Sequence, residues 1–415
     1  MRALSHISGF AIAVALACGP AFAADAPKAE VIHWWTSGGE AAAVKVLADS
    51  FDKSGGQWVD NAIAGGGGEA ARTAGINRIV GGNPPTMMQF NTGKQLDELI
   101  ANGYLANLDA AAAAGKWDSI LPKAIDEASK RDGHYYALPV NIHGANWLFY
   151  NTKVFADAGV PEPKTWSDVL AAGPKLKAKG VIPFAHGGQS WQDHILFDAV
   201  LLGEGGSDLY LSVYGKDAQK AIASPEFKHV AEVFKKLRDL MDPGMPGRNW
   251  NDATAMVITG KAGFQVMGDW AKGEFLAAGQ SPGKEYGCAV VGAEGGYIMG
   301  GDVFVFPKQK DGSAAGAQAK LESLILSPEV QIAFNSKKGS IPVRLDVDVS
   351  SMDLCAQKGA AAVKDPKKQI PSQTYLISPD ENGALNDVIT QYLNSPGESA
   401  DEFVAKFADA VKSAG

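Results

Sequence analysis

The chain has 415 residues, of which 46% are hydrophobic, 20% charged and 9% aromatic. This composition is typical of globular proteins and excludes disordered, collagen-like and coiled-coil chains, and the length predicts two or three domains. Lys and Arg number 38 against 46 Asp and Glu, so the net charge is -8. No basic run interrupts this acidic balance, which argues against nucleic-acid and anionic-membrane partners.

The first residues have the pattern of a secretory signal peptide. A short positive start, Met1-Arg2, precedes the apolar run Ile7–Ala17, which is too short to span a bilayer, and Ala21–Ala23 has the small-x-small pattern of a cleavage site. We therefore expect residues 1–23 to be removed on export. Cys18 leaves lipid attachment as an alternative, although the residue three positions before it is not the Leu that such sites prefer.

Removal of this segment leaves Cys288 and Cys355 as the cysteines of the mature chain. In an oxidising compartment, two thiols favour one disulfide, and two separate buried thiols are the alternative. C-x-x-C spacing is absent, which argues against redox chemistry and thiolate–zinc sites.

The first hundred residues of the mature chain alternate between strand and helix patterns. In chain order they are a strand over 31–35, a helix over 40–52, a strand over 57–63, a helix over 69–80, a strand over 86–90 and a helix over 94–102. Strands that alternate with helices at this spacing predict a parallel sheet with crossover helices.

Later segments carry clear boundary signals. Strand-like runs over 135–140 and 146–151 flank Asn141–Gly144, a pattern that suits a crossing between two lobes. Thr165 opens a predicted helix to Lys179 with Gly180 as its stop. Ser-Pro-Glu at 224–226 and at 327–329 opens two more helices, a strand is expected over 303–306, and a closing helix over 403–411.

Several catalytic and cofactor motifs are missing. The run Gly65–Gly68 continues into Glu69 rather than the Lys-Ser/Thr pair of a phosphate loop, so we interpret it as a turn that lets a helix terminus approach a neighbour closely. His186 and His194 fit no standard metal spacing, and no G-x-S-x-G elbow is present. We expect no cofactor. The 46 acidic residues leave a secreted glycoside hydrolase as the alternative to a binding protein.

Tryptophan gives a more specific signal. Trp34 and Trp35 form the carboxyl end of the first predicted strand, at the edge where open α/β sheets bind ligands. Alternation along a strand places one of them in the core and the other towards a cleft. Trp250 and Trp270 lie in polar segments that we expect to be loops. Aromatic rings among Asp, Asn and Lys side chains are typical of a sugar pocket, because the rings match the C–H face of a sugar and the polar groups match its hydroxyls.

Longer motifs resemble the extracellular solute-binding proteins of ABC sugar importers. They are Tyr136–Val140, Trp147–Asn151, Phe155–Gly159 with Pro163–Trp166, Trp34–Glu40, His186–Gln189, and Gly339–Arg344; the last three are similar to the glucose/mannose-binding branch. The resemblance covers nearly the whole mature chain. It implies two α/β lobes, each with a mostly parallel sheet flanked by helices, a hinge of several segments, and a sugar held in the cleft.

Eleven positions match the family's ligand-binding positions: Trp34, Trp35, Glu40, Gln89, Asn91, His143, Trp250, Trp270, Asp302, Lys338 and Tyr375. Two of them depart from the pattern. Asn91 stands where members of the branch carry His or Lys, and Tyr375 where they carry His. Both changes fall where hydroxyls would be recognised, so the resemblance implies an aldose without fixing it as glucose.

The resemblance also implies the domain division and the partners. Residues 24–141 and 302–345 form the first lobe, and 142–301 and 346–415 the second, which would place both Cys288 and Cys355 in the second lobe. We expect a monomeric periplasmic protein that binds a monosaccharide without chemical change and delivers it to the permease subunits. A binder of a non-sugar solute is a further alternative, although amino acids would require an Arg–carboxylate clamp.

Overall fold

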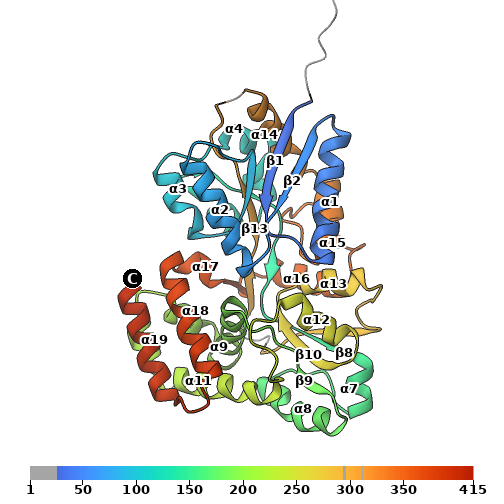
Figure 1. Cartoon of the computed structure of the whole chain (residues 1–415), viewed down its shortest axis with the longest axis vertical. Coiled ribbons are helices and arrows are strands. Elements are labelled where there is room, and N and C mark those ends of the chain that lie inside the picture. The colour runs from blue at the N-terminus through green and yellow to red at the C-terminus, as the bar shows by residue number, and fades with distance from the viewer. Residues whose placement is uncertain (1–25, 293–295, 311, 415) are drawn as a thin grey trace, which may run out of the picture.

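The computed structural model describes residues 26–292, 296–310 and 312–414, which form two α/β lobes, one above the other (Figure 1). The expected signal peptide over 1–23 and Cys18 lie outside these residues. Among the helices of the described ranges, none combines the length and apolar character needed to cross a membrane.

The first lobe is built on a five-stranded sheet of order β2-β1-β3-β13-β6. Its strands are β1 (Lys28–His33), β2 (Gln57–Ala62), β3 (Met87–Asn91), β6 (Leu138–Pro139) and β13 (Asp302–Val305). The helices of this lobe are α1 (Gly38–Lys53), α2 (Glu69–Val80), α3 (Asp97–Ala101), α4 (Asp109–Gly115), α5 (Trp117–Ile120), α6 (Lys123–Ala128), α14 (Gly312–Ile325) and α15 (Pro328–Lys338). The predicted strand–helix alternation of the first hundred residues is confirmed.

The second lobe is built on a four-stranded sheet of order β11-β8-β10-β9. Its strands are β8 (Trp147–Asn151), β9 (Ile182–Phe184), β10 (Ala262–Met267) and β11 (Tyr286–Val290). Helices on this side are α7 (Thr152–Ala158), α8 (Trp166–Ala178), α9 (Ser190–Val213), α10 (Ala218–Ile222), α11 (Pro225–Leu237), α12 (Trp250–Ile258), α13 (Ala271–Ala277), α16 (Leu354–Lys364), α17 (Gln373–Leu376), α18 (Pro379–Asn394) and α19 (Ala400–Ala414).

The chain passes between the lobes through a small central sheet. It has the order β14-β12-β7, from β7 (His143–Gly144), β12 (Tyr297–Gly300) and β14 (Gln369–Pro371), and an antiparallel bridge joins Ile142 to Ile341 beside it. A separate two-stranded sheet pairs β4 (Lys130–Arg131) with β5 (His134–Tyr135). One apolar cluster continues from the first sheet to Phe149 and Tyr286 of the second.

The two-lobed α/β fold is thus confirmed, with one difference in the sheets. Both are mixed rather than mostly parallel: β1 is parallel to β2 and β3, but β13 is antiparallel to β3 and β6. In the second sheet β8 is antiparallel to β10 and β11. The reason is the crossing, since β13 returns from the second lobe and enters the first sheet in the opposite direction.

The predicted helix boundaries at Thr165, Gly180 and Ser224 are confirmed by contacts or backbone conformation at these residues. The amide of Asp168 donates to Thr165 Oγ1 at 3.1 Å and the amide of Thr165 donates to Asp168 Oδ2 at 2.9 Å, which closes the capping box of α8. Gly180 follows the helix with φ 73°, a left-handed conformation that favours glycine. Ser224 caps α11 through its bond to the amide of Phe227.

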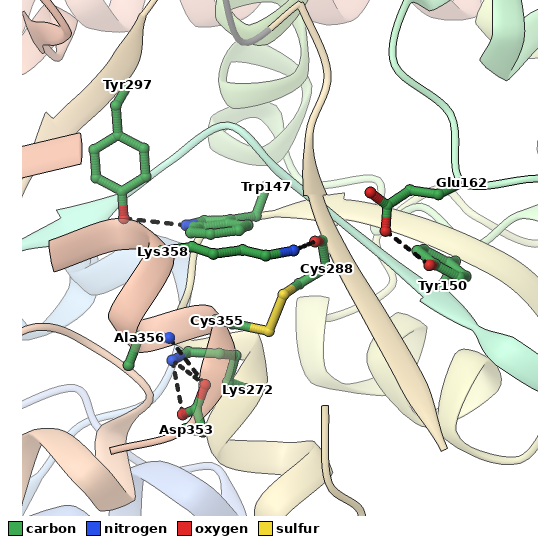
Figure 2. Close-up of a disulfide and its surroundings, with 10 residues drawn as sticks. All are labelled: Trp147, Tyr150, Glu162, Lys272, Cys288, Tyr297, Asp353, Cys355, Ala356 and Lys358. Carbon is green, nitrogen blue, oxygen red and sulfur yellow. Dashed lines mark hydrogen bonds and ion pairs between the residues drawn. A yellow bond between two sulfur atoms is a disulfide. The ribbon is translucent and has the colours of Figure 1, made fainter. Parts of the chain in front are cut away.

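The disulfide between Cys288 and Cys355 is present and joins β11 to α16 (Figure 2). Two polar contacts support it: Lys358 Nζ donates to the carbonyl oxygen of Cys288 at 3.1 Å, and Lys272 pairs with Asp353 at 3.0 Å, beside the first turn of α16. The bridge therefore fastens the last crossing segment to the sheet of the second lobe.

Candidate functional site

A cavity of about 400 Å³ lies between the lobes and draws its walls from both. Its size is within the range of small-molecule sites. Nine of the eleven predicted positions reach its wall: Trp34, Trp35, Glu40, Asn91, His143, Trp250, Trp270, Asp302 and Lys338. Gln89 and Tyr375 do not.

Trp34 and Trp35 divide as strand alternation predicts. Trp35 is 2% exposed and packs its edge against Phe304, with ring centroids 5.6 Å apart, so that it belongs mainly to the core. Trp34 is partly buried and faces the cavity, with the Arg72 guanidinium carbon 5.7 Å from its ring centroid.

The loop expectation is wrong for Trp250 and confirmed for Trp270, which lies in the turn between β10 and α13. Trp250 is the first residue of α12, behind the cap residue Asn249, and Trp270 is the cap residue of α13. The polar neighbours that suggested loops are typical of helix starts, because the first turn leaves its amides without helical acceptors. Trp270 presents its ring to the cavity and stands edge-on to His143, at 4.9 Å between centroids.

A buried ionic cluster forms the floor of the cavity where the lobes meet. His143 lies between two carboxylates: its Nδ1 bonds Asp269 and its Nε2 bonds Asp302 Oδ2 at 3.0 Å. Burial opposes protonation of the ring, but the two carboxylates outweigh it and raise the pKa of His143. Burial also disfavours the charge on Asp302, yet bonds from His143 and Asn141 lower its pKa. Asp302 is therefore ionised near neutral pH, and the charged form of His143 is favoured more than that of a free imidazole.

Glu40 and Lys338 form a second buried pair across the first lobe. Lys338 Nζ lies 3.0 Å from Glu40 Oε1, and the side chains are 2% and 8% exposed. Glu40 Oε2 accepts from the amides of Thr36 and Ser37 and so completes the capping box of α1. The Lys338 ammonium also lies 5.9 Å from the centroid of the Trp270 ring. The Glu40–Lys338 ion pair and the Trp270 ring thus lie side by side on one wall of the cavity.

Gln89 and Tyr375 lie behind the wall for identifiable reasons. The side chain of Gln89 accepts from the amide of Trp34 at 3.0 Å and donates to Asp302 Oδ1 at 2.9 Å, so both ends of its amide are occupied. Tyr375 lies on the short helix α17, whose neighbouring residues Gln373 and Thr374 reach the cavity instead. Burial raises the pKa of Tyr375. Gln89 acts as a support for two wall residues rather than as a contact.

The cavity wall also contains residues that the sequence did not indicate. They are Arg72, Trp191, Asn249, Asn382 and Asn386, among others. Trp191 stands two residues after the motif at 186–189, which is the one signal that could have found it. Asn386 carries no such signal, because it depends on the packing of α18 against α9.

Asn386 is oriented by a buried chain of polar groups. His194 Nδ1 lies 2.7 Å from Asn386 Oδ1, His194 Nε2 lies 3.0 Å from the Tyr214 hydroxyl, and that hydroxyl also bonds Asp198. Burial lowers the pKa of His194 to about 4 and raises the pKa of Asp198 to about 8. The Tyr214 hydroxyl donates to Asp198 and lies within hydrogen-bond distance of His194 Nε2, so these three side chains form a continuous chain behind the Asn386 carbonyl oxygen. The Asn386 NH2 group is then left for the cavity.

The described ranges contain no group of three or more His, Cys, Asp or Glu side chains placed to hold a metal ion. The buried carboxylates of the cavity, Glu40 and Asp302, are each bonded to a cationic partner. A glycosidase requires one carboxyl group that is protonated and free to act as an acid. Asp302, whose pKa is lowered, does not meet that requirement, and the oxygens of Glu40 are bonded to Lys338 and to two backbone amides.

The fold and the inter-lobe cavity define a two-lobed solute-binding protein. The family profile of the bacterial extracellular solute-binding proteins matches residues 35–331, and the chain belongs to this family. This membership confirms the expectation of a binding protein rather than an enzyme.

Named relatives match along nearly the whole chain. A "Probable sugar-binding periplasmic protein" of Brucella suis is 39% identical over 411 residues, covering 97% of each chain. A protein of the same name from Rhizobium meliloti is 40% identical over 399 residues, covering 94% of each. The solved structure of a chitin oligosaccharide binding protein superposes with a TM-score of 0.78 at 20% identity, covering 94% of this chain and 99% of that one, a likeness of fold alone.

Proposed function

We propose that the protein is the periplasmic solute-binding component of an ABC sugar importer, and that it binds a monosaccharide of the glucose/mannose type between its lobes. The observation that carries this proposal is the cavity wall, on which Trp34, Trp250 and Trp270 stand among Asp302 and Lys338. Flat aromatic surface and charged hydrogen-bonding groups are the two elements that sugar recognition requires. The names of the relatives point to the same class of ligand.

Residues 24–141 and 302–345 would move as one lobe and 142–301 and 346–415 as the other. Ligand would favour the closed arrangement, and the closed form would dock on the permease subunits of the importer. The proposal includes cleavage of residues 1–23, a periplasmic location and a monomeric protein. It places glucose among several candidates, because Asn91 and Thr374 offer neutral groups for the recognition of hydroxyls.

A thermal-shift screen of the mature protein tests the proposal. The panel contains D-glucose, D-mannose, D-galactose, D-xylose and maltose, with an amino-acid mixture and spermidine as the non-sugar arms. A ligand at about 100 times its dissociation constant adds ~2.7 kcal/mol to stability, which raises the melting temperature measurably. A shift with one monosaccharide, and recovery of that sugar unchanged by chromatography, is the expected result. A shift with a non-sugar solute alone would refute the proposal, and turnover of the sugar would restore the hydrolase alternative.

A further inference from the structure

The turn Gly65–Gly68, between β2 and α2, lies against tryptophan rings from both lobes. A Cβ atom built on Gly68 would lie 2.5 Å from the ring of Trp34 in the first lobe. A Cβ atom built on Gly67 would lie 3.1 Å from the ring of Trp191. Trp191 is the second residue of α9, which lies in the second lobe, whereas α2 lies in the first (Figure 1). The glycine turn therefore packs its backbone against the rings of Trp34 and Trp191, which both face the cavity.

The two sides of this contact are held in place. Arg72 Nη1 donates to the carbonyl oxygen of Gly67 at 3.3 Å and ties the turn to α2. On the opposite side the Trp191 indole N–H donates to Gln189 Oε1 at 2.9 Å, and Gln189 Nε2 donates to Asn249 Oδ1 at 3.1 Å. A ring anchored in this way has little freedom to retreat from a bulkier turn.

Trp191 also continues the aromatic wall of the second lobe. Its ring centroid lies 6.3 Å from that of Trp270, with the planes tilted by 45°. Both rings line the cavity and both are partly buried. Apolar ring surface that faces a cavity of about 400 Å³ is available to the C–H face of a ligand once the lobes are closed.

We propose that Trp191 is a ligand-contacting residue of the second lobe, and that the absence of a side chain at Gly67 sets how closely the lobes shut over the sugar. The inference deepens the proposed function and rests on it. A side chain at position 67 would meet the Trp191 ring before closure is complete, and the sugar would then lose contacts on the side of the second lobe.

The same turn supplies the matched control. Gly65 has φ 116° and Gly67 has φ 59°, so a side chain is strained at either position, but a Cβ atom on Gly65 would have no neighbour within 4 Å. Gly65→Val carries more backbone strain than Gly67→Val, because φ 116° lies outside the left-handed region that side chains tolerate, and it lacks the contact with Trp191. Gly67→Ala and Trp191→Phe are milder partners that keep the test informative if a valine variant fails to fold.

Calorimetric titration with the monosaccharide selected from the panel is the measurement, with small-angle scattering for the degree of closure. We expect Gly67→Val and Trp191→Ala to weaken binding by about tenfold or more. Gly67→Ala should show a smaller loss, Trp191→Phe should fall between wild type and Trp191→Ala, and Gly65→Val should stay within about threefold of wild type. The liganded Gly67→Val protein should keep the larger radius of gyration of the open form.

Equal affinities for the two valine variants, or an unchanged affinity in Trp191→Ala, would overturn the inference and leave the proposed function intact. If the wild-type protein binds none of the sugars of the panel, the proposed function fails and this inference fails with it. The two failures are thus told apart by the wild-type titration alone.

Discussion

Reduction of the Cys288–Cys355 bridge should lower the stability of the protein and leave its affinity for ligand nearly unchanged. The bridged residues are 67 positions apart in the sequence. For a loop of this length, the entropy removed from the unfolded chain corresponds to about 4 kcal/mol, an upper figure because any native strain subtracts from it. With an unfolding entropy of ~2.1 cal/mol/K per residue over roughly 390 residues, the melting temperature should fall by about 5 °C.

The unchanged affinity follows from where the bridge lies. It joins β11 to α16, which belong to the same lobe in the proposed division, and Cys288 and Cys355 are absent from the cavity wall. Differential scanning calorimetry with and without reductant gives the stability, and titration calorimetry gives the affinity. The double variant Cys288→Ser/Cys355→Ser is the control, since it should melt low and show no response to reductant. Two free thiols in the unreduced protein, detected by mass spectrometry, would contradict the pairing, and a large loss of affinity on reduction would refute the argument from position.

Three further predictions concern single side chains. Trp270→Ala should weaken sugar binding by ~1–3 kcal/mol through lost apolar burial, with little change in melting temperature; an unchanged calorimetric affinity would place the ring outside the binding surface. Asp302→Asn should cost about 1.5–3 kcal/mol of affinity, because a charge-assisted bond is replaced by a neutral one and His143 loses a carboxylate; equal titrations of variant and wild type would exclude Asp302 from binding. Asp198, whose pKa burial raises to about 8, holds a proton in the folded state that it gives up on unfolding, so wild-type stability should fall as the pH rises towards 8. Below pH 6.5 His194 has the opposite effect on stability: its pKa is lowered from 6.5 to about 4, so the unfolded chain binds a proton there that the folded chain does not. Urea unfolding is therefore compared at pH 6.5 and 8. Asp198→Asn should lose less stability between these two values than wild type does, and parallel losses would show that Asp198 ionises normally.

The features that could be predicted from the sequence are those set by neighbouring residues. The capping box of Thr165 and Asp168, the stop at Gly180 and the helix that starts at Glu69 depend on contacts within a few positions, and the structure confirms each. The direction of β13 depends on a segment that returns from the other lobe, and no local pattern records it. The mixed sheets therefore emerged only from the structure.

The candidate site divides in the same way. Asp302 and Asn91 are register partners on adjacent strands, and the family resemblance, rather than a local pattern, placed them at one site. Trp191 and Asn386 lie on long helices, and the face that such a helix turns to the cavity is decided by its packing against other helices. Gln89 was expected at the cavity wall, but its side chain lies behind the wall, where it is bonded to Trp34 and Asp302.

The position of β13 has a consequence for the order in which the molecule can assemble. It pairs with β3 on one side and β6 on the other, and Gln89 and Asp302, which bond across the first of these pairs, are 213 residues apart. A fragment that ends at residue 141 would leave the facing edges of β3 and β6 without partners, a state prone to aggregation. The five-stranded sheet can therefore be complete only after residues up to 305 have been synthesised, and contacts of such long range form slowly. A chain that stays unfolded until it is nearly complete is well suited to the export across a membrane proposed for this protein.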